Sequence, residues 1–212
     1  MHRFPKHLLD GYQHFMEGRY ARETERYKQL AIGGQSPTSM IIACCDSRAA
    51  PETIFDAGPG ELFVLRNIAN LVPPFQPDAG QHGTSAGIEY AVNALGIKDL
   101  IVLGHGRCGG IRWALNPGRP LAQGDFIGKW MSLLAPVTEQ VTTYSFMTSS
   151  ERETALERLS VRNSISNLRT FPYIRDKEAD GTLTVHGAWF DVSTAELWLM
   201  DHDTGDFVRT EL

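Results

Sequence analysis

Residues 40–48 have the sequence MIIACCDSR, which changes from apolar to polar at its centre. A short apolar run of this kind is typical of a buried strand in a parallel sheet. Residues 100–110, LIVLGHGRCGG, repeat the pattern, with His105 and Cys108 after the apolar run. The carboxyl ends of parallel strands meet at one edge of a sheet. We therefore expect Cys44, His105 and Cys108 to lie together at that edge.

These three residue types favour a particular kind of metal site. Two thiolates and one imidazole form a soft tetrahedral site with one open position, which is typical of catalytic zinc; structural zinc has four protein ligands. There is a plainer alternative for each residue alone. Most free cysteines are small buried hydrophobic residues, and His105 could be a hydrogen-bonded histidine at a strand end. The combination of Cys-x-Asp-x-Arg after one strand with His-x-x-Cys after another favours the metal site.

Apolar patterns predict strands and helices in alternation. Strands are expected at 40–44, 62–65 and 100–103 and, as a C-terminal hairpin, at 183–186 and 196–200. Helices are expected at 6–31, 51–55, 84–95, 109–115, 125–147 and 151–170. The predicted class is α/β: a mostly parallel, doubly wound sheet with flanking helices and an antiparallel edge near the C-terminus. We expect a single domain over residues 1–212, with an N-terminal helical arm over 1–34.

Composition excludes several classes of partner. The net charge of −5 and the absence of a basic cluster argue against nucleic acid. No apolar run approaches the roughly 18 residues that span a bilayer, so no membrane association is expected. The N-terminal segment lacks the apolar stretch of a signal peptide, and three cysteines, two of them adjacent, do not suggest a disulfide framework. A reducing cytoplasmic location is therefore expected.

The two motifs resemble those of the β-class carbonic anhydrases, zinc enzymes that interconvert carbon dioxide and bicarbonate. Residues 61–72, ELFVLRNIANLV, and 87–92, GIEYAV, are also similar to that family. The resemblance is close over residues 33–115 and looser outside them. It implies that Cys44, His105 and Cys108 bind one Zn²⁺ per subunit and that water takes the fourth position.

Asp46 and Arg48 are the candidate catalytic pair. Asp46 is two residues from a ligand, so its carboxylate could accept the hydrogen bond of zinc-bound hydroxide and orient that hydroxide toward the substrate. Arg48 could hold that carboxylate by a bidentate contact. The alternative is an ordinary surface salt bridge, typically worth 0–1 kcal/mol.

The resemblance also implies a substrate pocket. Gln35 matches a glutamine that donates a hydrogen bond to substrate in plant-type members, and Phe63, Ile68 and Tyr90 match an apolar wall for carbon dioxide. Gly109 could let backbone N–H groups approach bicarbonate. Without the resemblance, Gln35 would be a loop residue and the apolar three would be core residues.

Two departures at Ile41 and Phe190 imply that the chain resembles the plant-type subclass with an open zinc site. Bicarbonate-regulated bacterial members carry tryptophan, arginine and tyrosine where this chain has Ile41, Arg66 and Phe190, so only the arginine is retained. Family members are dimers or assemblies of dimers, and we expect a dimer or tetramer here.

Two other functions remain open from the sequence. One is hydrolysis of carbon disulfide or carbonyl sulfide on the same fold and zinc site. The other is a thiol redox or metal-sensing function of the adjacent Cys44 and Cys45, which is disfavoured because a disulfide between neighbouring residues closes a strained ring.

Overall fold

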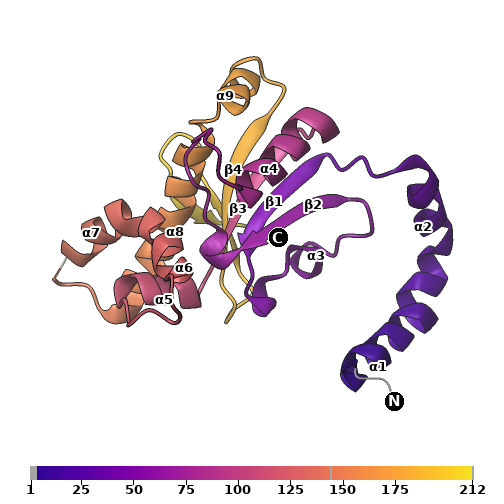
Figure 1. Cartoon of the computed structure of the whole chain (residues 1–212), viewed down its shortest axis with the longest axis horizontal. Helices are drawn as coiled ribbons and strands as arrows, with labels where there is room; N and C mark the ends of the chain where they lie inside the picture. The colour runs from indigo at the N-terminus through magenta and orange to yellow at the C-terminus, as the bar shows by residue number, and fades with distance from the viewer. Residues whose placement is uncertain (1–3, 144, 212) are drawn as a thin grey trace.

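The molecule is built on one sheet, seen in the computed structural model, which describes residues 4–143 and 145–211 (Figure 1). Six strands of this part of the chain follow the order β2-β1-β3-β4-β5-β6. They are β1 (Ser39–Cys44), β2 (Leu62–Asn67), β3 (Asp99–His105), β4 (Thr184–Phe190), β5 (Leu197–Met200) and β6 (Phe207–Arg209). The first four are parallel, and β5 and β6 run antiparallel to their neighbours. The predicted fold class is confirmed.

The register of the sheet brings the ends of β1 and β3 to the same level. Ala43 of β1 pairs with Leu103 of β3, and Cys44 is opposite Asn67 of β2. Side chains of β1 alternate between two cores, as the pleat requires. Met40 and Ile42 join the larger core, and Ile41 and Ala43 the smaller one on the other face. Buried apolar packing on both faces of β1 thus fixes the strand that carries Cys44.

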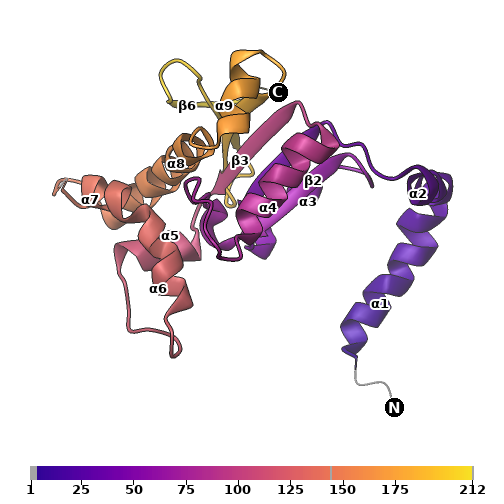
Figure 2. The same ribbon diagram turned by 45° about the horizontal axis from the view of Figure 1, so that its top comes forward.

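Helices flank the sheet and also extend beyond it (Figures 1 and 2). The α-helices are α1 (Lys6–Phe15), α2 (Ala21–Gly33), α3 (Pro51–Ile54), α4 (Gly83–Glu89), α5 (Gly109–Leu115), α6 (Phe126–Met131), α7 (Ala135–Thr143), α8 (Ser149–Leu168) and α9 (Pro172–Ala179). Two π-helical segments are η1 (Met16–Tyr20) and η4 (Tyr90–Leu95), and three 3₁₀ turns are η2 (Ser47–Ala49), η3 (Ile68–Asn70) and η5 (Ser132–Leu134). No helix of the described residues is both long and apolar enough to cross a membrane.

Some predicted elements were wrong in extent. The single helix expected over 125–147 is instead α6, η5 and α7, and Pro136 explains the break because its ring lacks an N–H and fits only a first helical turn. Helix α9 and strand β6 were not predicted. The hairpin of β4 and β5 is confirmed, as is the end of η4 at Gly96, which adopts the left-handed conformation (φ 66°).

The N-terminal arm stands apart from the sheet. In both views α1 and α2 extend away from the body of the molecule (Figures 1 and 2), and neither contains a buried residue. Its contacts with the body include the side chain of Leu30, which lies against Gly60. Arg19 donates to the carbonyl of Ala57 at 2.7 Å, and Arg26 forms an ion pair with Glu61 at 3.0 Å. An apolar stripe on α1 therefore remains exposed.

Candidate active site

Three ligand-type side chains converge where β1 and β3 end. Cys44 is the last residue of β1, His105 is the last of β3, and Cys108 directly precedes α5. Their ligand atoms all lie within 4.8 Å of one another, and the two Sγ atoms are 3.9 Å apart. All three residues are buried. The convergence predicted from the two sequence motifs is therefore present.

The imidazole of His105 is oriented for a ligand. Its Nδ1 lies 2.9 Å from the carbonyl oxygen of Gly106, which fixes the ring. Its Nε2 is buried and has no hydrogen-bond partner among the described residues. A buried nitrogen without a partner carries a desolvation cost. With two thiols beside it, this donor set fits a soft divalent metal such as zinc.

Hydrogen bonds favour the thiolate form of Cys44. The thiols of Cys44 and Cys108 share a hydrogen bond, and the backbone N–H of Ala69 donates to Cys44 Sγ at 3.3 Å. Together they lower the pKa of Cys44 despite its burial. Sharing its proton with Cys44 raises the pKa of Cys108. A divalent cation bound here would displace the thiol protons, because coordinated thiols are deprotonated.

Asp46 and Arg48 form the bidentate pair expected from the sequence. Nε and Nη2 of Arg48 donate to the two carboxylate oxygens of Asp46 at 2.9 and 2.8 Å, and the Arg48 backbone N–H donates at 3.0 Å. The guanidinium holds the pKa of Asp46 far below its usual range. Asp46 Oδ2 lies 4.0 Å from His105 Nε2, so the ionised carboxylate faces the ligand cluster.

Arg48 and Arg66 also hold the backbone around the site. Nη2 of Arg48 donates to the carbonyl of Arg107 at 3.1 Å. Arg66 donates to the carbonyls of Cys44 and Asp46 at 2.9 and 2.8 Å. Arg66 is thus occupied in supporting the turn that carries Asp46.

The segment after β2 covers Cys44 in a strained conformation. Ala69 and Asn70 both have positive φ angles, 62° and 50°, which are uncommon for residues other than glycine. The side chain of Asn67 closes the turn by bonding both the N–H and the carbonyl of Leu71. The indole of Trp130 donates to the carbonyl of Ile68 at 2.8 Å. These bonds hold the Ala69 N–H on the sulfur.

Glu157 is a site residue that the sequence analysis missed. It is 2% exposed on α8 and accepts hydrogen bonds from the Cys108 backbone N–H at 3.1 Å and the Trp189 indole at 3.2 Å. Burial raises its pKa to about 7. A signal was available, because Glu157 falls in register with Val161 and Ile165 on the apolar stripe of the helix.

The predicted substrate residues divide into two groups. Ile68 and Gly109 lie beside the ligand cluster, Ile68 at 40% exposure and Gly109 directly after Cys108. Phe63 and Tyr90 contact each other, with ring centroids 5.9 Å apart, but Phe63 is four strand residues before Asn67. At about 3.3 Å per residue, that is about 13 Å from the level of Cys44.

Gln35 lies between α2 and β1 and is exposed. It precedes Ser39, the first residue of β1, whereas Cys44 is the last residue of that strand. Gln35, Phe63 and Tyr90 therefore do not line the metal site of their own subunit.

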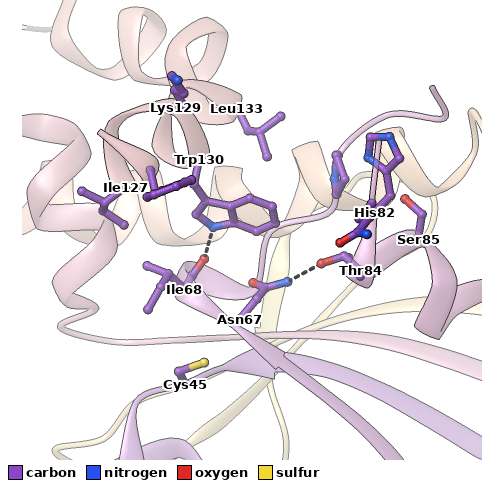
Figure 3. A pocket seen from close by; sticks show the side chains of 14 residues that line it. Cys45, Asn67, Ile68, His82, Thr84, Ser85, Ile127, Lys129, Trp130 and Leu133 are labelled. Carbon is purple, nitrogen blue, oxygen red and sulfur yellow. Dashed lines mark hydrogen bonds between the residues drawn. The ribbon is translucent and has the colours of Figure 1, made fainter. Parts of the chain in front are cut away.

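A groove of about 770 Å³ lies between the end of β2, the start of α4 and helix α6 (Figure 3), and none of Cys44, Asp46, His105 and Cys108 is among its lining residues. Its lining residues include Cys45, Ile68, His82, Lys129 and Trp130. The Cys45 thiol is exposed here, whereas Cys44 is buried against Cys108. The adjacent cysteines are thus both free and lie in different environments, which does not favour a redox pair.

Comparisons with known proteins agree on one family. Residues 39–197 match the family model described as "Carbonic anhydrase". The carbonic anhydrase of Pseudomonas aeruginosa is 33% identical over 201 residues, covering 95% of this chain and 90% of that protein. Beta carbonic anhydrase 5, chloroplastic, of Arabidopsis thaliana is 32% identical over 191 residues, covering 89% of this chain and 62% of that protein.

Solved structures give the same result. The β-carbonic anhydrase CcaA superimposes with a TM-score of 0.90 at 29% identity, covering 98% of this chain and 92% of that one. A β-carbonic anhydrase of Sordaria macrospora, described as tetrameric, has a TM-score of 0.80 at 31% identity and covers 96% of this chain and 98% of that one.

Proposed function

Because the chain belongs to the β-class carbonic anhydrases, we propose that it catalyses the reversible hydration of carbon dioxide to bicarbonate, with one zinc ion held by Cys44, His105 and Cys108. The observation that carries this proposal is the convergence of two thiols and a partnerless imidazole nitrogen within 4.8 Å. Three protein ligands leave one position of a tetrahedral zinc for water or substrate.

Zinc, when bound, lowers the pKa of water from about 15.7 toward about 7, which makes hydroxide available near neutral pH. The protein supplies orientation. Asp46 stays ionised because of Arg48, so its Oδ2 can accept a hydrogen bond from the attacking oxygen and aim a lone pair at carbon dioxide. Ile68 offers an apolar surface, which suits an uncharged substrate. Gly109 leaves its backbone uncovered beside Cys108 for contact with bicarbonate.

The substrate pocket is completed, in our proposal, by a second copy of the chain. Gln35 and Tyr90 are exposed and lie away from the metal cluster of their own subunit. Helix α1 also exposes an apolar stripe that has no partner on the described part of its own chain. A dimer would provide a surface for that stripe and could bring Gln35, Phe63 and Tyr90 to a neighbouring site. We propose the dimer as the catalytic unit.

We propose a reducing, cytoplasmic location, which the three free cysteines support. Two of them are the proposed zinc ligands, and oxidation would prevent them from binding metal. Fractionation of the source cells would test this location.

The proposed function is tested by measuring the zinc content and the rate of carbon dioxide hydration of the same protein. Purified protein should contain one zinc per chain and hydrate carbon dioxide in a stopped-flow assay. Cys44→Ser and Cys108→Ser should lose zinc and activity together. Cys45→Ser is the matched control, because its thiol is exposed and outside the cluster, and it should keep both.

Full zinc retention by both ligand variants would refute the assignment. A parallel assay with carbon disulfide distinguishes the proposed reaction from hydrolysis of carbon disulfide. Release of sulfide without hydration of carbon dioxide would refute the proposed reaction but not the zinc site.

A further inference from the structure

Glu157 is a buried carboxylate whose hydrogen bonds lead directly to a proposed zinc ligand. Removing a carboxylate from water is costly unless donors compensate it. Here Oε1 accepts from the backbone N–H of Cys108 and Oε2 from the indole N–H of Trp189. The two donors come from different parts of the fold, the turn after β3 and the second-last residue of β4.

The carboxylate is held by a rigid support. Helix α8 begins with a capping box formed by Thr148 and Glu151. It packs closely on β3, since a Cβ added at Gly104 would lie 2.7 Å from Val161. Trp189 is paired with Gly104 in the sheet, and the guanidinium of Arg158 lies over its ring, 4.7 Å from the centroid. Helix α8, which carries Glu157, and the Trp189 side chain, which donates to it, are therefore both held in place.

The turn that Glu157 contacts needs support. Arg107, between His105 and Cys108, has a left-handed φ of 57°, a conformation that costs energy for a residue with a side chain. Arg48 bonds its carbonyl on one side, and Glu157 bonds the next N–H, that of Cys108, on the other. The two bonds clamp the turn that carries Cys108.

We propose that Glu157 is a positioning residue that fixes the direction of the Cys108 thiolate toward zinc by holding the backbone N–H of Cys108. This role of Glu157, a residue outside both sequence motifs, rests on the zinc site of the proposed function. Partners of metal ligands commonly change metal affinity by about 10–100-fold when they are replaced.

Glu157→Gln tests the proposal because it keeps the size of the side chain but replaces one acceptor with an NH₂ donor. That donor must face either the Cys108 N–H or the Trp189 N–H, both of which are donors themselves. We expect zinc to leave this variant about 10–100-fold faster when a chelating indicator is added. Glu153→Gln, one helical turn earlier and paired with Arg112, is the control and should release zinc at the wild-type rate.

A double variant distinguishes positioning from packing. Trp189→Phe removes the indole donor, so in Glu157→Gln/Trp189→Phe the amide can turn its NH₂ away from Cys108 and accept with its oxygen. We expect zinc release from the double variant to return toward that of Trp189→Phe alone. Release from Glu157→Gln at the wild-type rate, or no recovery in the double variant, would overturn the proposal.

Should Glu157→Gln fail to fold, Glu157→Asp provides a spectroscopic test. Its shorter side chain should shift the sulfur-to-metal charge-transfer band of the cobalt-loaded protein, and an unchanged band would contradict the positioning role. Wild-type protein that binds neither zinc nor cobalt would instead refute the proposed function itself, so the two failures are distinguishable.

Discussion

Arg48 keeps Asp46 charged, and Asp46 is not a metal ligand. Its replacement should therefore affect the rate of hydration and not the binding of zinc. Asp46→Asn should keep a full zinc complement because no ligand changes. The rate of hydration should fall by about 10–100-fold, because asparagine can present an N–H to the attacking oxygen and misorient it. Asp203→Asn, at an exposed turn, is the control. Near-normal turnover of zinc-loaded Asp46→Asn would mean that the pair with Arg48 serves the fold alone.

The same pair determines a pH dependence. Arg48 depresses the pKa of Asp46, so the carboxylate is charged at every pH well above that value and loses its charge only in strong acid. Asp46 therefore contributes no titration between mildly acid and alkaline pH. We expect kcat/KM to rise toward alkaline pH along a single ionisation, that of the reacting water. A steep, cooperative loss of activity near neutral pH, deepened by bicarbonate, would show that Asp46 leaves Arg48.

At the scale of single elements, the two glycines that start α5 have different surroundings. A Cβ at Gly110 would lie 3.0 Å from the Cβ of Ala69 and 3.1 Å from Ile68, whereas a Cβ at Gly109 would meet nothing within 4 Å. The close approach allows the strained segment after β2 to reach Cys44. Gly110 is therefore needed for packing, which its sequence context alone does not reveal.

Gly110→Ala should displace Ala69 and weaken both folding and zinc retention. Gly109→Ala adds the same methyl group one residue earlier and should keep zinc. Alanine also favours the helix by about 0.5–1 kcal/mol in both variants, so the comparison cancels that effect. Thermal unfolding and metal analysis would measure the outcome. Equal melting temperatures and equal zinc contents would show that the Gly110 contact is unimportant.

Helices and strands that have a clear apolar pattern in their own sequence could be predicted from it. The apolar runs before Cys44 and His105 identified β1 and β3, and parallel topology then predicted the ligand cluster. Strand β6 was missed because its three residues are too few for a periodic pattern. Glu157 was missed because a glutamate in a charged helix normally faces solvent, and its burial depends on Trp189 and Cys108, which are distant in sequence. The register of Glu157 with Val161 and Ile165 was a local signal of its burial, but that signal could not identify its distant partners.

At the scale of the whole molecule, the arm carries apolar surface that the described chain does not cover. Leu8, Tyr12 and Met16 recur at four-residue spacing on one side of the arm and are 49%, 60% and 37% exposed. Exposed stripes of this kind commonly mark interaction surfaces. Together with the outlying Gln35 and Tyr90, the stripe supports a dimer in which each copy completes the other's site.

Sedimentation should accordingly show no species near the 23.6 kDa mass of one chain at micromolar concentration. Leu8→Glu/Tyr12→Glu places charge on the apolar stripe and should yield a folded monomer that still binds zinc, because the ligand cluster lies within one chain. Its hydration rate should fall because the partner no longer supplies Gln35, Phe63 and Tyr90. Glu25→Gln alters charge on the same arm without changing the stripe and should remain dimeric and active. A fully active monomer would show that one chain forms the complete substrate pocket, and Phe63 and Tyr90 would then be residues of the fold alone.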